Sequence, residues 1–146
     1  MRRKDVQDNI LVETDFLFSL RPGEKAHEAA LDILRDSRRG IYKLHISPAS
    51  PIEASLVMSS YGLKDKEVSR ALRVMEEAVR LYINPIYPGL SLANLGVAAD
   101  LREKYELTFF DSIHAAVALS YSLIYIGGDK RVREALASEG GRAKPL

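Results

Sequence analysis

The chain of 146 residues has 47% hydrophobic and 28% charged residues and a formal net charge of +1, a composition typical of a globular protein rather than of a general nucleic-acid coat. It has no cysteine, which excludes disulfides, zinc ribbons and thiol nucleophiles, and its apolar runs are too short to span a bilayer. The basic residues 1–5 lead only into the short run Ile10–Val12, so we expect no secretory signal. We therefore predict one domain over residues 1–146, located in the cytoplasm and without membrane contact.

The first half of the chain alternates strand and helix patterns. The run Asn9–Val12 predicts a strand that continues into an apolar turn. Apolar residues at helical spacing then predict a helix from Ala26 to a stop at Gly40. Leu44–Ser47 predicts the second strand, after which Ser50 and Pro51 predict a helix with serine as its cap and proline at its first position.

The second half repeats this alternation. The predicted elements are, in chain order, a helix with an apolar stripe at Val68–Val79, a short strand or turn at Tyr82–Pro85, a helix from Ser91 to Lys104, a helix across Phe110–Tyr121, a strand at Leu123–Ile126 and a short helix from Asp129 to Ala137. Strands that alternate with helices over short connections predict a parallel sheet covered on both faces. The expected fold is an α/β, three-layer α/β/α sandwich with a central parallel sheet.

Acidic residues follow the predicted strands or occupy the first turns of predicted helices. They are Glu13, Asp15, Glu53, Asp111 and Asp129. In a parallel sheet these positions gather at one edge, where ligands bind at the reversal of strand order. Carboxylates that converge there repel one another unless a cation lies among them. Because the chain has no cysteine and three scattered histidines, such a site suits a hard cation, Mg²⁺ or Mn²⁺.

Each acid also fits a purely structural role. Ser50–Glu53 and Thr108–Asp111 both fit capping boxes, in which the acid satisfies a backbone amide. Asp129 fits an N-cap, and Glu13 and Asp15 lie two residues apart, on one face of a strand end where solvent can hold both. The joint pattern favours a metal site, because capping does not require separate elements to place their acids on the same rim of one sheet.

Motif-bearing segments follow one another along nearly the whole chain in an order found in a known family. They are Ile10–Leu17, Ile46–Glu53, Phe110–Leu119 and Ile124–Asp129. In this order they resemble the PIN-domain ribonucleases, particularly the VapC-type toxins. The resemblance implies a PIN-like fold and a metal-dependent endoribonuclease that cleaves RNA phosphodiester bonds. It also implies that the protein is the toxin of a toxin–antitoxin pair, with an antitoxin protein as partner and Mg²⁺ or Mn²⁺ as cofactor.

The resemblance implies catalytic and metal-binding roles for all the acids named above. Glu53 and Asp111 are the expected principal ligands, Glu13 or Asp15 the third, and Asp129 a more peripheral acid. The family's first catalytic aspartate aligns with Glu13, which is one methylene longer, so Asp15 remains the alternative for that role. The family also often has Thr or Ser where this chain has Gly127, so a hydroxyl that orients a carboxylate or water is absent from that position.

Several further roles stay open at the level of sequence. Ser112, Lys130 and Arg131 are candidate contacts for RNA phosphates or ordinary structural residues, and His114 either hydrogen-bonds an acid or RNA, or packs in the core. The Val68–Val79 helix and the segment with Tyr82 and Tyr87 are a candidate homodimer face. A nucleotide-binding Rossmann module is disfavoured, because no glycine-rich loop follows the first strand. The main alternative is a catalytically silent PIN-like module that binds RNA or a partner protein.

Overall fold

The sheet of the computed structural model, which describes residues 6–146, is entirely parallel and has the strand order β2-β1-β3-β4. Its strands are β1 (Asp8–Val12), β2 (Tyr42–Ile46), β3 (Ile124–Ile126) and β4 (Ala143–Lys144). In the register, Ile10 of β1 pairs with Leu44 of β2 on one side and with Ile124 of β3 on the other. The predicted central parallel sheet is therefore confirmed. Residues 1–5, on which the expectation about a secretory signal partly rests, lie outside the described residues.

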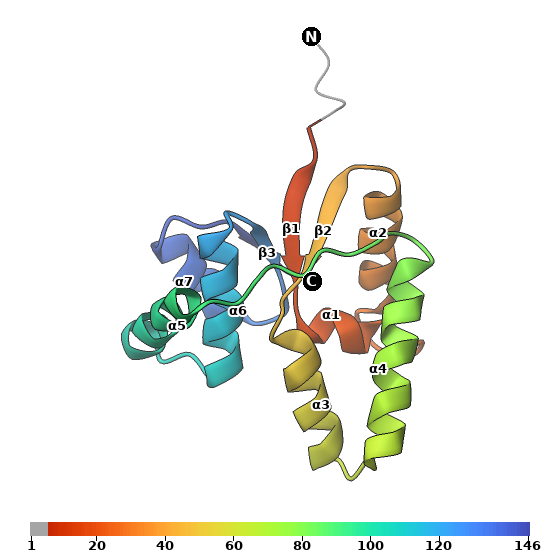
Figure 1. Cartoon of the computed structure of the whole chain (residues 1–146). Coiled ribbons are helices and arrows are strands. Elements are labelled where there is room, and N and C mark those ends of the chain that lie inside the picture. Colours follow the sequence, from red (N-terminus) through yellow and green to blue (C-terminus); the bar gives the residue numbers. More distant parts are fainter. Residues whose placement is uncertain (1–5) are drawn as a thin grey trace.

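Helices cover both faces of the sheet (Figure 1). They are α1 (Thr14–Ser19), α2 (His27–Arg38), α3 (Ser50–Ser60), α4 (Asp65–Arg80), α5 (Leu92–Tyr105), α6 (Phe109–Ser120) and α7 (Lys130–Ser138). In Figure 1, α5, α6 and α7 lie on one side of the strands, and α1, α2 and α4 lie on the other. The predicted α/β/α sandwich is confirmed. No helix among residues 6–146 has the length and apolar character needed to cross a membrane.

Alternation along the strands divides the core into two parts. Ile10 and Val12 of β1 face a cluster built with α1, α2 and β2, whereas Leu11 between them faces a cluster built with α5, α6 and α7. Successive side chains of a strand point to opposite faces of the sheet, so Tyr125 at the centre of β3 faces the same side as Leu11. This alternation places the Tyr125 ring beneath α6.

The structure corrects several local predictions. The residues after β1 form the short helix α1 rather than an apolar turn. Ala49, not Ser50, is the N-cap of α3, and its helix has no side-chain cap. By contrast, the predicted strand or turn at Tyr82–Pro85 is confirmed as a turn at Tyr82, and Ile86 farther on makes a β-bridge to His45 of β2. The short strand β4 was not predicted, because two residues carry no periodic pattern.

Candidate metal centre

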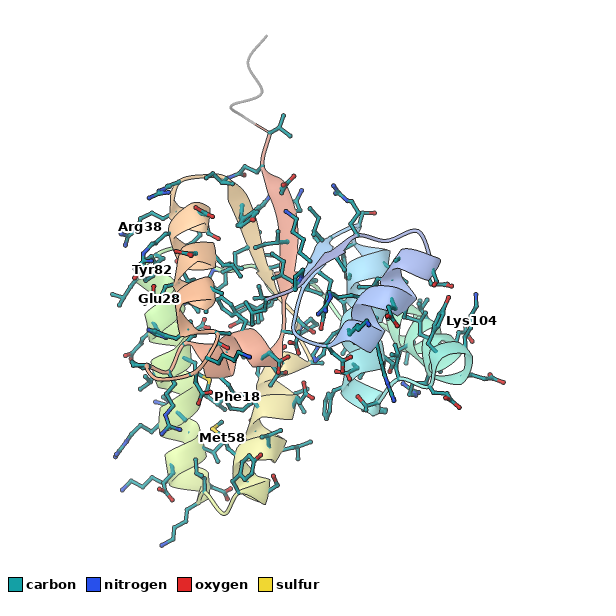
Figure 2. All side chains as sticks on the ribbon, turned by 180° about the vertical axis from the view of Figure 1, so that it is seen from behind. Phe18, Glu28, Arg38, Met58, Tyr82 and Lys104 are labelled. Atoms are coloured by element: carbon teal, nitrogen blue, oxygen red, sulfur yellow. The ribbon has the colours of Figure 1, made fainter. Side chains whose placement is uncertain are left out.

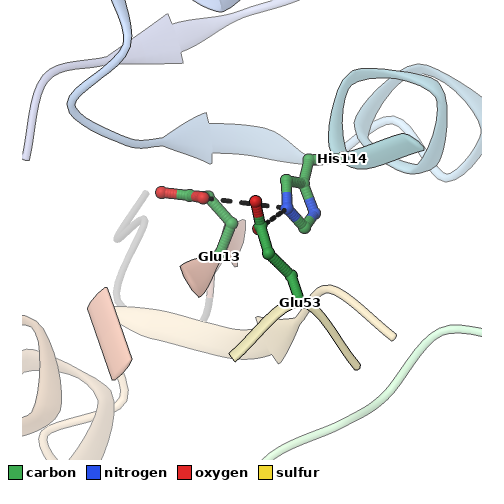
Figure 3. A group of neighbouring side chains, drawn as sticks. All are labelled: Glu13, Glu53 and His114. Carbon is green, nitrogen blue, oxygen red and sulfur yellow. Dashed lines mark hydrogen bonds and ion pairs between the residues drawn. The ribbon is translucent and has the colours of Figure 1, made fainter. Parts of the chain in front are cut away.

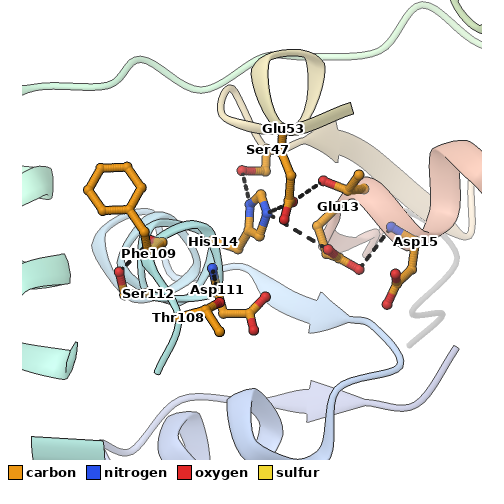
Figure 4. Close-up of polar contacts among 10 residues, drawn as sticks. Glu13, Asp15, Ser47, Glu53, Thr108, Phe109, Asp111, Ser112 and His114 are labelled. Carbon is orange, nitrogen blue, oxygen red and sulfur yellow. Dashed lines mark hydrogen bonds and ion pairs between the residues drawn. The ribbon is translucent and has the colours of Figure 1, made fainter. Parts of the chain in front are cut away.

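The strand order reverses between β1 and β3, and the acids gather beyond the carboxyl ends of these strands. Glu13 directly follows β1 and Asp129 follows β3. Glu53 and Asp111 lie in the first turns of α3 and α6. Asp15 lies in the first turn of α1, so it does not share a strand face with Glu13, because β1 ends at Val12. Figure 4 shows that the labelled acids come together from separate elements.

Glu13 and Glu53 form the buried part of this group together with His114 of α6 (Figure 3). One ligand atom from each of these residues lies within 4.8 Å of the others. Nε2 of His114 is 2.9 Å from Oε1 of Glu53 and 3.8 Å from Oε2 of Glu13. Glu13 is only 4% exposed and His114 is fully buried. The Glu13 carboxylate is therefore shielded from solvent, whereas the Glu53 side chain is half-buried.

His114 is held on both sides of its ring. Nδ1 lies 2.6 Å from the hydroxyl oxygen of Ser47, which follows β2 and is itself buried. The Thr14 hydroxyl donates to the same oxygen of Glu53 that contacts His114 Nε2. Both ring nitrogens thus have protein partners. Of the alternatives for His114, the structure shows a buried histidine that hydrogen-bonds an acid.

These surroundings shift the pKa values of Glu13 and Glu53 in opposite directions. Burial, followed by the charge of Asp15, raises the pKa of Glu13 from 4.5 to about 9. Burial also disfavours ionisation of Glu53, but the hydrogen bonds from His114 and Thr14 outweigh it and lower the pKa of this carboxyl. Without a cation, Glu53 is therefore the ionised member of the pair and Glu13 carries a proton near neutral pH.

Asp111 and Asp129 form the second part of the acidic group. Burial raises the pKa of Asp111 against the hydrogen bond of Thr108, and the charge of Asp129 raises it further. Oδ1 of Asp129 also accepts a hydrogen bond of 2.8 Å from the backbone N–H of Arg131 and so caps α7. The N-cap role of Asp129 is thus confirmed, but it occupies only one carboxylate oxygen.

The capping-box alternatives predict that the Glu53 and Asp111 carboxylates bind backbone N–H groups at the starts of their helices. The Glu53 carboxylate accepts from Thr14 and His114 through Oε1, and within residues 6–146 it makes no capping hydrogen bond to the start of α3. For Asp111, the backbone N–H points to the Thr108 hydroxyl at 3.4 Å. A reciprocal bond from the Asp111 carboxylate to the backbone of Thr108 does not occur among the described residues. The Asp111 carboxylate is therefore not used for capping.

Asp15 lies at the exposed border of the group. Its backbone N–H donates to Oε1 of Glu13 at 3.2 Å, and its carboxylate extends toward the loop after β3. A Cβ atom placed on Gly128 would lie 3.2 Å from Oδ2 of Asp15. The exposed Asp15 therefore spans from α1 to the β3–α7 loop, while Glu13 points to Glu53 and His114.

A family model described as PIN domain matches residues 10–136 of the chain. The chain belongs to the PIN-domain family. Members of this family are generally metal-dependent nucleases. No curated protein sequence matches the chain.

Solved structures show the same fold at low sequence identity. VapBC2 from Rickettsia felis, bound to a DNA fragment from its promoter, is 12% identical over 94% of this chain and 98% of that chain, with a TM-score of 0.64. A toxin–antitoxin complex from Klebsiella pneumoniae is 19% identical over 82% and 86%, with a TM-score of 0.56. PAE2754 from Pyrobaculum aerophilum is 20% identical over 94% and 83%, with a TM-score of 0.55.

The donor atoms of this PIN domain fit a divalent cation. Glu13 and Glu53 offer carboxylate oxygens, the ligands that Mg²⁺ and Mn²⁺ prefer, within one cluster, and Asp111 offers another at the same sheet edge but outside that cluster. His114 lies within the same cluster, but its nitrogens are engaged by Ser47 and Glu53. The histidine therefore orients a carboxylate rather than adding a soft ligand to the site.

Sequence reasoning missed three polar residues of this PIN domain: Thr14, Ser47 and Tyr125. Thr14 and Ser47 directly follow or nearly follow strand ends, a position that could have marked them. Tyr125 belongs to an otherwise apolar strand and is fully buried. Burial, followed by the charges of nearby acids, raises its pKa above the ordinary value. The sequence feature that could have identified Tyr125 is a hydroxyl-bearing residue in a strand that is followed by two glycines.

Of the three candidate RNA contacts, Ser112 has a structural role, and Lys130 and Arg131 remain predictions. Ser112 is buried, accepts a hydrogen bond of 2.8 Å from Arg102 and donates to the carbonyl of Phe109. Of the two alternatives for Ser112, the structure favours the structural residue. Lys130 and Arg131 are exposed at the start of α7, beside Asp129. Their positive charges lie next to the acidic edge of the PIN domain.

Proposed function

We propose that this PIN domain is a Mg²⁺- or Mn²⁺-dependent endoribonuclease that acts as the toxin of a toxin–antitoxin pair. The observation that carries the proposal is the placement of buried Glu13 beside Glu53, on the edge shared with Asp111. Carboxylates with so little solvent repel one another, so their convergence favours a bound cation. The proposal includes residues 1–146 as one PIN-like domain in the cytoplasm.

The geometry supports the following residue roles. Glu13, Glu53 and Asp111 are proposed ligands, Asp129 a peripheral acid, and Asp15 the alternative to Glu13. When bound, Mg²⁺ or Mn²⁺ supplies activation of water and charge stabilisation for in-line cleavage of a phosphodiester. The chain itself fixes the ligand geometry.

The fixed part of that geometry is Glu53. His114 and Thr14 both hydrogen-bond its Oε1, which orients the carboxyl plane. Glu13 must release its proton to act as a charged ligand, since burial favours its neutral form. No side chain is required as a nucleophile.

RNA is the proposed substrate. The exposed side chains of Lys130 and Arg131 lie next to Asp129, where positive charge can bind phosphates beside the acidic centre. The test is incubation of the purified protein with single-stranded RNA in Mn²⁺, with EDTA as the matched control. Cleavage that EDTA stops supports the nuclease, whereas RNA binding without cleavage supports the alternative, a catalytically silent PIN-like module.

An apolar groove supports an antitoxin as partner. It lies between α1, α3 and α4 and has a volume of about 750 Å³. Phe18 and Met58, which line it, are labelled in Figure 2. Its exposed members include Tyr61 and Val74. Such a groove suits the apolar side of a partner segment, and two of the similar structures are toxin–antitoxin assemblies. An antitoxin that inhibits the parent should inhibit the Val74→Glu variant more weakly, with RNA cleavage unchanged.

The homodimer stays a prediction. Val68 and Val79 pack inside the protomer, whereas Val74 and Tyr87 remain partly exposed near them. Only the outer side of α4 and the following segment is thus available for a contact between copies. Sedimentation equilibrium of the purified protein measures this state.

A further inference from the structure

The Tyr125 side chain reaches from the middle of β3 to the acidic edge. Residues 125 and 127 point to the same face of the strand, because side chains alternate along it. A Cβ atom placed on Gly127 would collide with the hydroxyl and the adjoining ring atoms of Tyr125. The Tyr125 hydroxyl therefore occupies the space where a side chain at position 127 would begin. This space is two residues beyond Tyr125, toward the carboxyl end of the strand.

Position 127 follows the carboxyl end of β3, the edge of the sheet where the acids gather, and Oδ2 of Asp15 lies close to the next residue, Gly128. After burial, the charges of Glu13, Asp111, Asp15 and Asp129 raise the pKa of the Tyr125 hydroxyl. Tyr125 has 0% exposure, and its hydroxyl has no hydrogen-bond partner among the described residues. An unpaired buried hydroxyl destabilises a fold, and buried polar groups in folded proteins nearly always have partners.

We propose that Tyr125 is a positioning residue of the metal centre, whose hydroxyl donates a hydrogen bond to the carboxylate cluster, directly or through one water, in the cation-bound protein. This inference rests on the proposed function. The phenol takes the place of the hydroxyl that a Thr or Ser at position 127 would supply. Gly127 leaves room for this hydroxyl, because a side chain at position 127 would collide with Tyr125 as it lies in the structure.

The test is Mn²⁺ binding by isothermal titration calorimetry to the parent, Tyr125→Phe and Tyr121→Phe proteins. Tyr121 is the matched control, because its hydroxyl donates to the Gly89 carbonyl and its side chain is exposed. Removing a group that orients metal ligands typically weakens binding roughly 10–100-fold. We expect a loss of this size for Tyr125→Phe and none for Tyr121→Phe.

Two further readouts separate positioning from packing. Without a divalent cation, Tyr125→Phe should melt at the same or a higher temperature than the parent, because it removes only an unpaired hydroxyl. Addition of Mg²⁺ should change the tyrosine ultraviolet difference spectrum of the parent but not that of Tyr125→Phe. A lower melting temperature in EDTA combined with unchanged Mn²⁺ affinity would assign the hydroxyl to packing and overturn the inference.

A second variant pair tests the exchange of the two positions. Tyr125→Leu shortens the side chain and frees the space beside residue 127, and adding Gly127→Thr returns a hydroxyl there. The double variant should bind Mn²⁺ more tightly than Tyr125→Leu alone.

Equal Mn²⁺ affinity of the parent and Tyr125→Phe overturns the inference and leaves the proposed function standing. Absence of Mn²⁺ binding by the parent overturns both.

Discussion

Oε1 of Glu53 lies 2.9 Å from Nε2 of His114, although 61 residues separate them in the chain. The contact joins the first turn of α3 to the buried face of α6. Because Ser47 engages the other ring nitrogen, the imidazole cannot turn without breaking a buried hydrogen bond. The carboxylate of Glu53 is thus oriented by a rigid partner rather than by solvent.

Replacing His114 tests this orientation. His114→Leu leaves the Ser47 hydroxyl unpaired and removes a donor from Glu53, so we expect stability to fall by roughly 1–3 kcal/mol. RNA cleavage should fall about 10–100-fold, the usual effect of losing a group that orients a metal ligand. Urea denaturation and cleavage rates measure the two effects.

His45→Gln is the matched control for this prediction. His45 of β2 contacts only backbone carbonyls, those of Ile10 and Lys43, among the hydrogen bonds of the described residues. Its replacement should leave the cleavage rate near that of the parent. A His114→Leu protein that cleaves RNA as fast as the parent would show that the histidine does not orient the centre.

Glu13 and Asp15 should differ as ligands. Glu13 faces Glu53 and His114, whereas Asp15 is exposed at the border of the group. Glu13→Gln should therefore lower the cleavage rate by orders of magnitude, and Asp15→Asn should have the milder effect. Glu13→Asp restores the residue of the resembled family and should preserve or raise activity. Similar mild effects of Glu13→Gln and Asp15→Asn on single-turnover cleavage would remove this segment from the site.

Glu13 also makes the stability of the metal-free protein depend on pH. Burial and the charge of Asp15 raise its pKa from 4.5 to about 9, so the folded chain holds this proton more tightly than the unfolded chain. The resulting stabilisation is complete below pH 4.5 and is lost as the pH rises toward 9. The free energy of unfolding, measured with urea in EDTA, should fall across this window.

Glu13→Gln should flatten the dependence of the free energy of unfolding on pH. The surface variant Glu134→Gln is the matched control and should leave that dependence unchanged. Glu53 acts in the opposite sense, since hydrogen bonds lower its pKa despite burial. Its stabilisation is present above the unfolded pKa and is lost as the pH falls. An unchanged slope in Glu13→Gln would assign the pH dependence to other groups.

Much of the fold was predictable because its signals are local. A short apolar run marks β1, and helical spacing marks α2 and α6, each within a short stretch of sequence. The helix α1 was missed because its six residues, Thr14–Ser19, are too few to display a period. The strand β4 depends on the pairing of Ala143 with Tyr125, a tertiary contact that no local pattern encodes.

The candidate site was predictable only in outline. Positions after strands identified the acids, but not which of them would be buried together. His114 and Ser47 meet across 67 residues of chain, and only the packing of α6 against the sheet brings them into contact. The position of the Tyr125 hydroxyl could not be predicted, because an aromatic residue in an apolar strand is typical of the core.

Divalent cations should stabilise the fold by mass action, because they bind the folded chain and its converged carboxylates preferentially. The melting temperature should rise with Mg²⁺ or Mn²⁺ far more than with NaCl of equal ionic strength. The double variant Glu53→Gln with Asp111→Asn should lose this gain. Differential scanning fluorimetry measures it, and an undiminished gain from Mn²⁺ in the double variant would mean that these acids share no cation.

Cleavage of single-stranded RNA by the parent, Asp111→Asn and Asp100→Asn proteins tests the metal centre most directly. Asp111→Asn keeps the size of the side chain but removes a ligand charge, whereas Asp100 is an exposed residue of α5 that is not a proposed ligand. In Mn²⁺, the parent and Asp100→Asn should cleave at similar rates that EDTA abolishes, and Asp111→Asn should be slower by about 100-fold or more. A folded Asp111→Asn protein that cleaves as fast as the parent would contradict the proposed site.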